Sequence, residues 1–369
     1  MNTTIPQDIL DAFSLTACLG SVVPFGNGHI NDTYLVEQLL PEGTIHFILQ
    51  HMNKKIFKQP VELMENLTGV TSWIRSKAIE AGGDPDRETL NVKPAADGKS
   101  YYVDTEGEYW RVLEFVEDSV CYEQVSSPDD FYRSALAFGN FQRLLSDYPA
   151  HTLHETIPDF HNTPQRFQNF LKVLAEDPCR RAASVQEEIE FVRSREAYMH
   201  TLTDREKSGV LPLRVTHNDT KLNNILFDRE TGKALCVIDL DTVMPGLSVN
   251  DFGDSIRFGA STAAEDEQDL SKVSCDLELF EVYSKGFIEG CQGDLTDAEV
   301  HSLIDGAIMM TLECGMRFFT DHLDGDHYFK IHREGQNLDR ARTQFTLVAD
   351  MEQKRPQMEA IIEKIVAEL

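Results

Sequence analysis

Two short segments constrain the fold and the function of this chain more than any others. Residues 217–224 read His-Asn-Asp-Thr-Lys-Leu-Asn-Asn, and residues 237–241 read Val-Ile-Asp-Leu-Asp. The first has the spacing H-x-D-x-x-x-x-N. The apolar runs 225–227 and 234–238 flank a polar turn that contains Gly232, which is typical of a β-hairpin. Such a hairpin would fix a polar loop at one end and an acidic pair at the other, so that both could face one ligand.

The residue types in this pattern suit the transfer of a phosphoryl group. That reaction needs an aligned hydroxyl group and neutralised phosphate charge more than covalent help from the protein. A carboxylate at Asp219 can orient an acceptor hydroxyl or take its proton, and Lys221 can reach the transferred phosphate as a point charge. Asn224 and Asp239 are suitable ligands for Mg²⁺, which keeps its other positions for phosphate and water oxygens. Asp241 offers a further carboxylate.

The motif H-x-D-x-x-x-x-N followed by I-D-x-D resembles the aminoglycoside phosphotransferase and choline kinase superfamily. The longer strings 216–227 and 237–246 are similar to those of bacterial N-acetylhexosamine 1-kinases. So are Gly-Asn-Gly-His-Ile-Asn at 26–31 and the segments 316–318 and 328–330. The resemblance spans nearly the whole chain. It implies an α+β, bilobal, protein-kinase-like fold, with a small lobe of one five-stranded antiparallel sheet and one helix, and a large, mainly helical lobe.

The order of predicted elements agrees with two lobes, since 369 residues exceed what one core usually supports. A helix is predicted over 61–81, ending near Gly82 and Gly83. Strands are predicted within 22–36 (two strands around a glycine turn), 45–50, 101–103 and 109–116. We predict a small nucleotide-binding lobe over residues 1–120, including the connection between the lobes. Residues 121–369 are predicted to carry the catalytic loop, the metal segment and the acceptor site.

The glycine turn is a candidate binding site for the phosphates of ATP. Gly26, Asn27 and Gly28 could turn over the nucleotide and offer backbone N–H groups to phosphate. The same residues could also serve an ordinary hairpin. Their place before the predicted third strand favours the nucleotide role.

One departure from protein kinases concerns the third strand, where those enzymes carry a lysine. Here the strand ends in Gln50, so the sequence leaves unassigned the cation that steadies the α- and β-phosphates. Residues 111–116, which include Glu114 and Val116, resemble the connection between the lobes. In that role their backbone would hydrogen-bond adenine.

Two further positions need separate interpretation. His217 completes the candidate catalytic set and is expected to brace the loop through hydrogen bonds rather than perform chemistry. Asp251-Phe252-Gly253 matches the metal-binding triplet of protein kinases in letters but lies too far from Asn224. We expect Asp251 to support the catalytic loop from below, as a later aspartate does in related small-molecule kinases, and Asp254 to cap a helix.

The resemblance implies that Arg317, Tyr328 and His29 contact a sugar acceptor beside Asp219. An arginine can donate to hydroxyl or carbonyl oxygens, and a tyrosine can both stack and hydrogen-bond. From the residues alone, Arg317 could equally form a surface ion pair with Asp321 or Asp324.

Composition excludes several other classes of protein. A net charge of −28 argues against nucleic acid, which demands clustered Lys and Arg. The charge slightly favours a cationic acceptor, but less than the motifs favour a sugar. No apolar run is long enough for a membrane span, and the N-terminus lacks a signal peptide's features. Seven scattered cysteines without C-x-x-C pairs suggest a reduced, cytoplasmic setting and no zinc site.

The motifs predict a kinase that uses ATP and Mg²⁺, and the resemblance implies that it phosphorylates the anomeric hydroxyl of N-acetylglucosamine or N-acetylgalactosamine. The first alternative is the same machinery acting on an aminoglycoside, choline or another hexose. The second is a nucleotide-binding regulator without catalysis, which the intact set of Asp219, Asn224 and Asp239 argues against. The preferred epimer, the nucleotide selectivity and the oligomeric state stay open.

Overall fold

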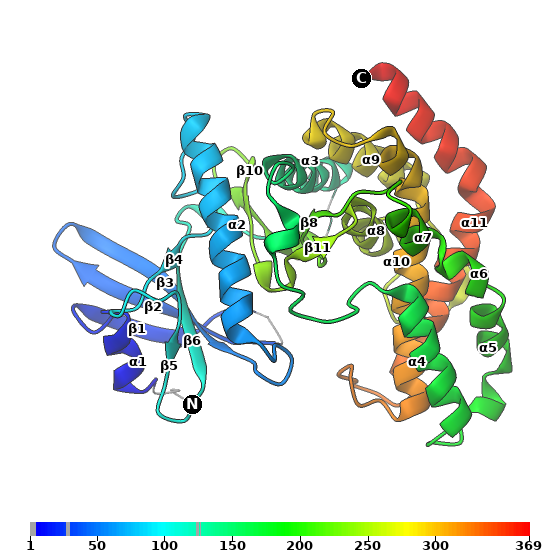
Figure 1. The fold of residues 1–369 in the computed structure, drawn as a ribbon, viewed down its shortest axis with the longest axis horizontal. Helices are drawn as coiled ribbons and strands as arrows, with labels where there is room; N and C mark the ends of the chain where they lie inside the picture. The colour runs from blue at the N-terminus through cyan, green and yellow to red at the C-terminus, as the bar shows by residue number, and fades with distance from the viewer. Residues whose placement is uncertain (1–4, 27–29, 123–124, 126) are drawn as a thin grey trace. The chain divides into compact units, whose positions relative to one another are not determined.

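The computed structural model describes residues 5–26, 30–122, 125 and 127–369. The chain has a mixed α+β fold made of two compact units (Figure 1). The sheet unit comprises Met1–Cys121, Asp147–Ile157 and Leu226–Met244. The helical unit comprises Tyr122–Ser146, Pro158–Ile225 and Pro245–Leu369. The sheet unit thus includes two segments that lie well beyond residue 121.

The sheet unit is built on an antiparallel sheet with the order β1-β2-β3-β6-β4, in which β5 also pairs with β6. The strands are β1 (Leu19–Pro24), β2 (Asp32–Leu40), β3 (Gly43–Met52), β4 (Val92–Lys93), β5 (Tyr102–Val103) and β6 (Tyr109–Glu114). The predicted sheet is confirmed, with β4 as an additional strand. β4 has only two residues, too few to show the alternation by which a strand is predicted.

Among the described residues, two α-helices belong to this unit rather than the one expected. The predicted helix is α2 (Pro60–Glu80), which begins at a proline as the first helical turn allows. The additional helix is α1 (Gln7–Ala12). Its buried Ile9 and Leu10 belong to one apolar cluster with Leu49 and Val112 of the sheet. Six residues are too few for the apolar period of a helix to be recognised.

The predicted hairpin is also present. β9 (Ile225–Asp228) and β10 (Ala234–Val237) are neighbours in a small sheet with β7 (Ser119–Val120), in the order β10-β9-β7. The Asp228 amide donates to the Lys233 carbonyl at 2.8 Å and closes the turn. The 3₁₀ turn η4 (Leu240–Thr242) follows, so the segment with Asp239 and Asp241 comes directly after the hairpin.

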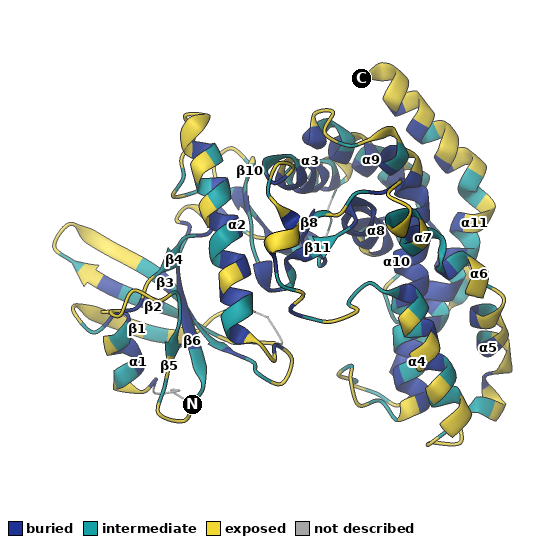
Figure 2. Cartoon of the chain, in the orientation of Figure 1, coloured by how far each residue is buried: buried dark blue, intermediate teal, exposed yellow. Residues whose placement is uncertain are grey.

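The helical unit is organised around α10 (Asp297–Asp324), which is buried along nearly its whole length (Figure 2). The other helices are α3 (Pro128–Leu144), α4 (Thr163–Glu176), α5 (Gln186–Arg193), α6 (Glu196–Met199), α7 (Thr201–Lys207), α8 (Ser248–Gly259), α9 (Leu277–Cys291) and α11 (Gln336–Glu368). Two short strands, β8 (Arg214–Thr216) and β11 (Met244–Gly246), pair with each other. This unit also contains the 3₁₀ turns η2 (Ala182–Ser184), η3 (Leu222–Asn224) and η5 (Leu270–Lys272), whereas η1 (Ala150–Thr152) belongs to the sheet unit.

The packing of α8 on α10 depends on two glycines. A Cβ atom added at Gly306 would lie 2.1 Å from the Val249 carbonyl oxygen, and one at Gly253 would lie 2.3 Å from the Gly306 carbonyl oxygen. Only glycine therefore permits this close approach of the backbones. The contact fixes α8, the helix that supports the catalytic loop. Within the described ranges, no helix combines the length and apolar character needed to cross a bilayer.

Candidate active site

The loop between β8 and η3 contains the candidate catalytic residues, and α8 holds it from one side. Asp251 of α8 is almost fully buried, at 1% exposure. Its Oδ2 accepts a hydrogen bond from the His217 amide at 2.9 Å, and its Oδ1 accepts one from the Asn218 amide at 2.8 Å. Oδ2 also accepts from Gln142 Nε2 at 2.7 Å. The predicted bracing role of Asp251 is confirmed.

Three further contacts join Thr220 of the loop to α8. Its Oγ1 donates to the Asp251 carbonyl at 2.6 Å, its amide donates to Asp254 Oδ2 at 3.2 Å, and its carbonyl accepts from Ser255 Oγ at 2.7 Å. The expectation that Asp254 caps a helix is wrong. Asp254 lies inside α8, where its carboxylate pairs with Arg257 at 2.9 Å.

Removal of the Asp251 carboxylate is expected to destabilise the protein more than it weakens metal binding. In Asp251→Ala the buried amides of His217 and Asn218 would lose their acceptor, at a cost of roughly 2–4 kcal/mol. Urea denaturation would show this as a lower transition midpoint, and calorimetry would show Mg·ADP affinity close to wild type. An unchanged midpoint would contradict the bracing role.

His217 is fully buried, with its ring edge-on to Phe138 and Phe141 at 5.6 and 5.9 Å. Its Nδ1 accepts a hydrogen bond from the Asp219 amide at 3.2 Å. The preceding turn requires Asn218 at φ 65°, a left-handed conformation that Asn tolerates better than most residues. The imidazole thus helps to set the direction in which Asp219 leaves the loop.

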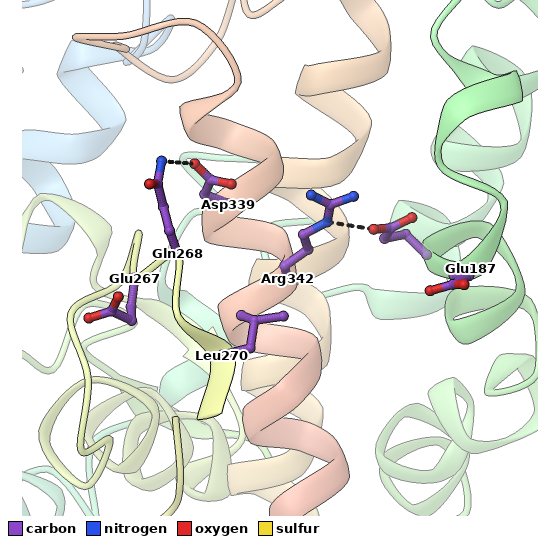
Figure 3. Close-up of a pocket in the computed structure, with 7 residues that line it drawn as sticks. Glu187, Glu267, Gln268, Leu270, Asp339 and Arg342 are labelled. Carbon is purple, nitrogen blue, oxygen red and sulfur yellow. Dashed lines mark hydrogen bonds and ion pairs between the residues drawn. The ribbon is translucent and has the colours of Figure 1, made fainter. Parts of the chain in front are cut away.

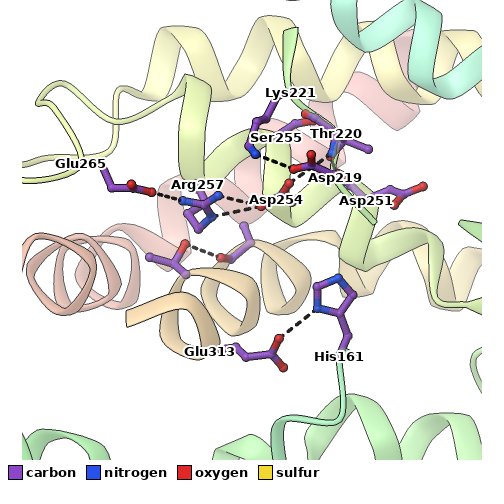
Figure 4. Close-up of polar contacts among 12 residues, drawn as sticks. His161, Asp219, Thr220, Lys221, Asp251, Asp254, Ser255, Arg257, Glu265 and Glu313 are labelled. Atoms are coloured by element: carbon purple, nitrogen blue, oxygen red, sulfur yellow. Dashed lines mark hydrogen bonds and ion pairs between the residues drawn. The ribbon is translucent and has the colours of Figure 1, made fainter. Parts of the chain in front are cut away.

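Three predicted residues, Asp219, Lys221 and Asn224, contact one another here, and Figure 4 shows the first two. Lys221 Nζ lies 2.7 Å from Asp219 Oδ1, and Asn224 Nδ2 donates to the Asp219 carbonyl at 2.8 Å. The Asp219 and Lys221 side chains are 29% and 35% exposed, so both can be reached from outside. Burial would lower the pKa of Lys221, but the carboxylates of Asp219 and Asp254 outweigh it and hold that pKa above its ordinary value. Lys221 is therefore a stable cation beside the candidate base.

The second acidic segment belongs to the sheet unit. Asp239 adopts a left-handed conformation with φ 57° and ψ 56°. Asp241 is buried, its Oδ1 accepting from Arg111 at 2.5 Å and its Oδ2 from Asn31 Nδ2 at 2.7 Å. Both carboxylate oxygens of Asp241 therefore already accept hydrogen bonds within the sheet unit.

Arg111 is the buried cation beside the glutamine that replaces the third-strand lysine. Gln50 and Arg111 stand opposite each other in the pairing of β3 with β6, and Arg111 Nε donates to Gln50 Oε1 at 2.8 Å. Arg111 is 2% exposed. Sequence reasoning missed its role, although a single arginine among apolar strand residues indicates a buried charge that needs a partner.

Substitution of Arg111 by methionine is expected to be strongly destabilising. It leaves the Asp241 carboxylate buried without its cation, and breaking a buried pair in this way costs about 3–5 kcal/mol. Chemical denaturation would measure the loss. The matched control is Lys99→Met, which removes the exposed pair with Asp97 and should leave the midpoint nearly unchanged. Equal midpoints for the two variants would contradict the importance of the buried pair.

The predicted nucleotide-binding residues are only partly visible. Gly26 has φ 76°, which suits glycine, while Asn27, Gly28 and the acceptor candidate His29 lie outside the described residues. Glu114 ends β6, and its amide donates to the Asn91 carbonyl at 2.8 Å. The Val116 carbonyl accepts from Ser119 Oγ at 2.6 Å. Their role toward adenine stays a prediction.

Arg317 of α10 is surrounded by aromatic rings. Its guanidinium carbon lies between 5.5 and 5.8 Å from the ring centres of Phe160, Tyr328 and Phe329. Among the residues that the structure describes, Arg317 forms no ion pair, so the pairing with Asp321 or Asp324 is wrong. Asp321 instead accepts from the backbone amides of segment 327–329, at 2.8 to 2.9 Å. This holds the loop that carries the 68% exposed Tyr328.

A second arginine, which the sequence did not single out, belongs to the same cluster. Arg166 of α4 donates to the Phe160 carbonyl at 3.0 Å, and its Nε is buried without a hydrogen-bond partner in the described part of the chain. Burial lowers the pKa of Arg166, and the neighbouring charge of Arg317 lowers it further. Two guanidinium groups therefore converge near Phe160.

A separate pocket contains none of the predicted residues (Figure 3). Its charged groups largely pair with one another, with Arg342 Nε 2.6 Å from Glu188 and Gln268 donating to Asp339 at 3.1 Å. It is lined by Glu187, Glu188, Glu267, Gln268, Leu270, Asp339 and Arg342.

The donors available for Mg²⁺ are amide and carboxylate oxygens, the ligand types that this ion prefers. Because the Asn224 NH₂ group donates to Asp219, its carbonyl oxygen is the atom it can offer to a cation. Over the described residues, no cluster of three or more His, Cys, Asp or Glu side chains is arranged to hold a metal. Asn224 of the helical unit and Asp239 of the sheet unit each carry an oxygen donor of this type, and their joint role toward the ion stays a prediction.

Comparisons with known proteins show the family and the fold of this chain. The model of the family described as "Phosphotransferase enzyme family" matches residues 21–274, more than half of the chain. An aminoglycoside phosphotransferase from Alicyclobacillus acidocaldarius has a similar structure, with a TM-score of 0.62, 13% identity and coverage of 100% of this chain and 98% of that one. A microcompartment-associated aminopropanol kinase gives a TM-score of 0.58 and 17% identity, covering 92% and 93%. A Plasmodium vivax ethanolamine kinase gives 0.51 and 14%, covering 89% and 82%.

Proposed function

The chain belongs to the phosphotransferase enzyme family, and from this premise we propose that it transfers the γ-phosphoryl group of ATP to the anomeric hydroxyl of an N-acetylhexosamine, forming the sugar 1-phosphate. The observation that carries the reaction type is the loop on which Asp219, Lys221 and Asn224 are held together. Support for an uncharged acceptor comes from the cluster around Arg317.

The catalytic loop would act mainly by positioning. Asp219 accepts the proton of the acceptor hydroxyl, whose oxygen bonds to the γ-phosphorus as the bond to the leaving ADP oxygen breaks. Lys221 lies beside that carboxylate and neutralises charge on the transferred group. His217 and Asp251 keep the loop in place through the hydrogen bonds described above.

Asn224 and Asp239 are the proposed ligands of Mg²⁺, with Asp241 better suited to holding Arg111. When bound, the ion neutralises phosphate charge. The chain's own contribution is to present the two oxygen donors, one on the catalytic loop and one directly after the β9–β10 hairpin. The glycine turn at 26–28 and the segment around Glu114 and Val116 are proposed to contact ATP.

The acceptor assignment is supported by Arg166 and Arg317. Two guanidinium groups disfavour a nearby ammonium group by charge repulsion, whereas their donors suit hydroxyl and carbonyl oxygens. The structures compared above include kinases named for aminopropanol and ethanolamine, which carry amines. The arginine pair argues against a cationic acceptor here more strongly than the net charge of −28 argues for one.

An acceptor screen tests this proposal directly. ADP formation would be measured with N-acetylglucosamine, N-acetylgalactosamine, glucose, glucosamine, choline, ethanolamine and an aminoglycoside. Phosphorus NMR of the product would distinguish a 1-phosphate from a phosphate at another hydroxyl. Turnover of choline or the aminoglycoside without turnover of either N-acetylhexosamine would overturn the acceptor assignment and leave the kinase assignment intact.

Arg317→Ala is expected to raise the KM for the hexosamine by about ten- to a hundredfold, the effect of losing one charge-assisted hydrogen bond worth roughly 1.5–3 kcal/mol. The KM for ATP should move little, because Arg317 is proposed to contact only the acceptor. Steady-state kinetics with each substrate varied in turn would measure both. Arg193→Ala, at an exposed position of α5, is the control. An unchanged sugar KM in a folded Arg317→Ala protein would remove Arg317 from the acceptor site.

A further inference from the structure

A buried carboxylate in α10 has no role in the reaction described so far. Glu313 is 0% exposed. Its Oε1 accepts a hydrogen bond from His161 Nδ1 at 2.9 Å, and its Oε2 accepts one from Thr163 Oγ1 at 2.6 Å. Burial opposes ionisation of Glu313, but the hydrogen bonds from His161 and Thr163 outweigh it and hold its pKa below the usual value. Glu313 therefore acts as an ionised acceptor that orients the His161 ring.

The two ring nitrogens of His161 have different hydrogen-bonding roles in this arrangement. Nδ1 donates to Glu313, so in the neutral imidazole Nε2 is an acceptor. Nε2 is buried and has no hydrogen-bond partner in the described part of the chain. A buried polar atom without a partner is uncommon and indicates a water or ligand that completes it. His161 Nε2 is thus an oriented nitrogen whose hydrogen-bonding capacity is unused among the described residues.

The position of His161 connects it with the catalytic loop. In Figure 4 the ring lies above Glu313, with its second nitrogen on the side of Asp219 and Asp254. Asp254 Oδ2 in turn accepts a hydrogen bond from the amide of Thr220 in the loop at 3.2 Å.

The same residue adjoins the cluster assigned to the acceptor. His161 follows Phe160, whose ring lies 5.7 Å from the Arg317 guanidinium and whose carbonyl accepts from Arg166. The rings of Phe160 and His161 are themselves 4.6 Å apart. The segment Phe160–His161 therefore contacts Glu313 through the His161 ring and both arginines through Phe160.

We propose that His161 binds the acceptor through Nε2, accepting a hydrogen bond from one of its hydroxyl or amide N–H groups, and that Glu313 positions the ring for this contact. The inference rests on the proposed function, because it concerns the acceptor site of that reaction. Nε2 is shielded from solvent, so a hydrogen bond made there meets little competition from water.

The test uses two isosteric substitutions of His161. His161→Asn keeps an amide N–H that can donate to Glu313 and removes the atom at Nε2, whereas His161→Gln places its terminal amide near the Nε2 position. His161→Asn should raise the acceptor KM about tenfold, the effect of one lost hydrogen bond, with the KM for ATP within about twofold of wild type. His161→Gln should recover part of the loss. His301→Asn, at an exposed position of α10, is the control.

The role of Glu313 is tested by a double substitution. If Glu313 acts through His161, Glu313→Gln should raise the acceptor KM alone but add nothing to His161→Asn, because residues acting as a unit are not additive. A purely structural role would instead lower thermal stability additively and leave both KM values unchanged, which would overturn the proposal.

The acceptor screen separates the two levels of inference. If N-acetylhexosamines are phosphorylated and His161→Asn has a wild-type acceptor KM, the His161 proposal fails and the proposed function stands. If another acceptor is phosphorylated instead, the proposed function fails, and the same variants are measured with that acceptor. A raised KM there would sustain the role of His161, and an unchanged one would overturn it.

Discussion

Asp219→Asn is expected to lower kcat by about 10²–10⁴, the usual range for losing a general base, while ATP binding is retained. The asparagine has nearly the same shape, and the Asp219 backbone contacts with His217 and Asn224 do not depend on the carboxylate. The proton of the acceptor hydroxyl would have no base, and Lys221 would lose its 2.7 Å partner. Steady-state assays would give kcat, and calorimetry would give the nucleotide affinity.

The matched control for this variant is Asp204→Asn, an isosteric change at an exposed position of α7. It removes the same charge from the helical unit and should leave kcat unchanged. Near-normal turnover of Asp219→Asn would remove Asp219 from the mechanism. A loss of nucleotide binding in that variant would indicate a structural defect and would also contradict the assignment.

Asp239→Ala is expected to abolish measurable activity and sharply weaken binding of Mg·ATP. The carboxylate is the strongest proposed protein ligand of the ion, and few others are available to compensate because Mg²⁺ is usually held by one or two carboxylates. Asp241 is not a ready substitute, since both of its oxygens already accept hydrogen bonds from Arg111 and Asn31. Calorimetry with ADP, with and without Mg²⁺, would separate loss of the metal from loss of the nucleotide.

The comparison with Asp251→Ala makes this a test between two metal assignments. Asp251 belongs to the Asp-Phe-Gly triplet, but its carboxylate is occupied by the His217 and Asn218 amides and by Gln142. If Asp251→Ala lost the Mg²⁺ dependence of ADP binding and Asp239→Ala kept it, the assignment of Asp239 would be wrong.

Much of the fold could be predicted because its elements carry local signals. The hairpin after Asn224 follows from two apolar runs around a polar turn, and α2 follows from a helical stretch that ends near Gly82 and Gly83. The short elements could not be predicted in this way, because β4 and α1 depend on pairing and packing with distant residues. Asp254 was assigned wrongly because a capping aspartate and a paired interior aspartate look the same until Arg257 and Thr220 are located.

The candidate site shows the same difference between residues with a local sequence signal and residues whose partners are distant in the sequence. The catalytic loop is contiguous, so its spacing alone predicted Asp219, Lys221 and Asn224. Gln50 and Asp241 both accept hydrogen bonds from Arg111, which lies far from both in the sequence. Glu313 and His161 are likewise 152 positions apart. Such pairs become visible only when the fold brings them together.

The discontinuous make-up of the sheet unit has a consequence for how the chain can be divided and how it folds. A fragment ending at Cys121 would lack β9, β10 and Asp241, so Arg111 would have to be buried without its carboxylate. During synthesis from the N-terminus, Arg111 likewise lacks the Asp241 carboxylate until residue 241 has emerged from the ribosome. The two units therefore cannot be separated by a single cut. Expression of the first 121 residues alone should yield an aggregation-prone polypeptide rather than a folded nucleotide-binding domain.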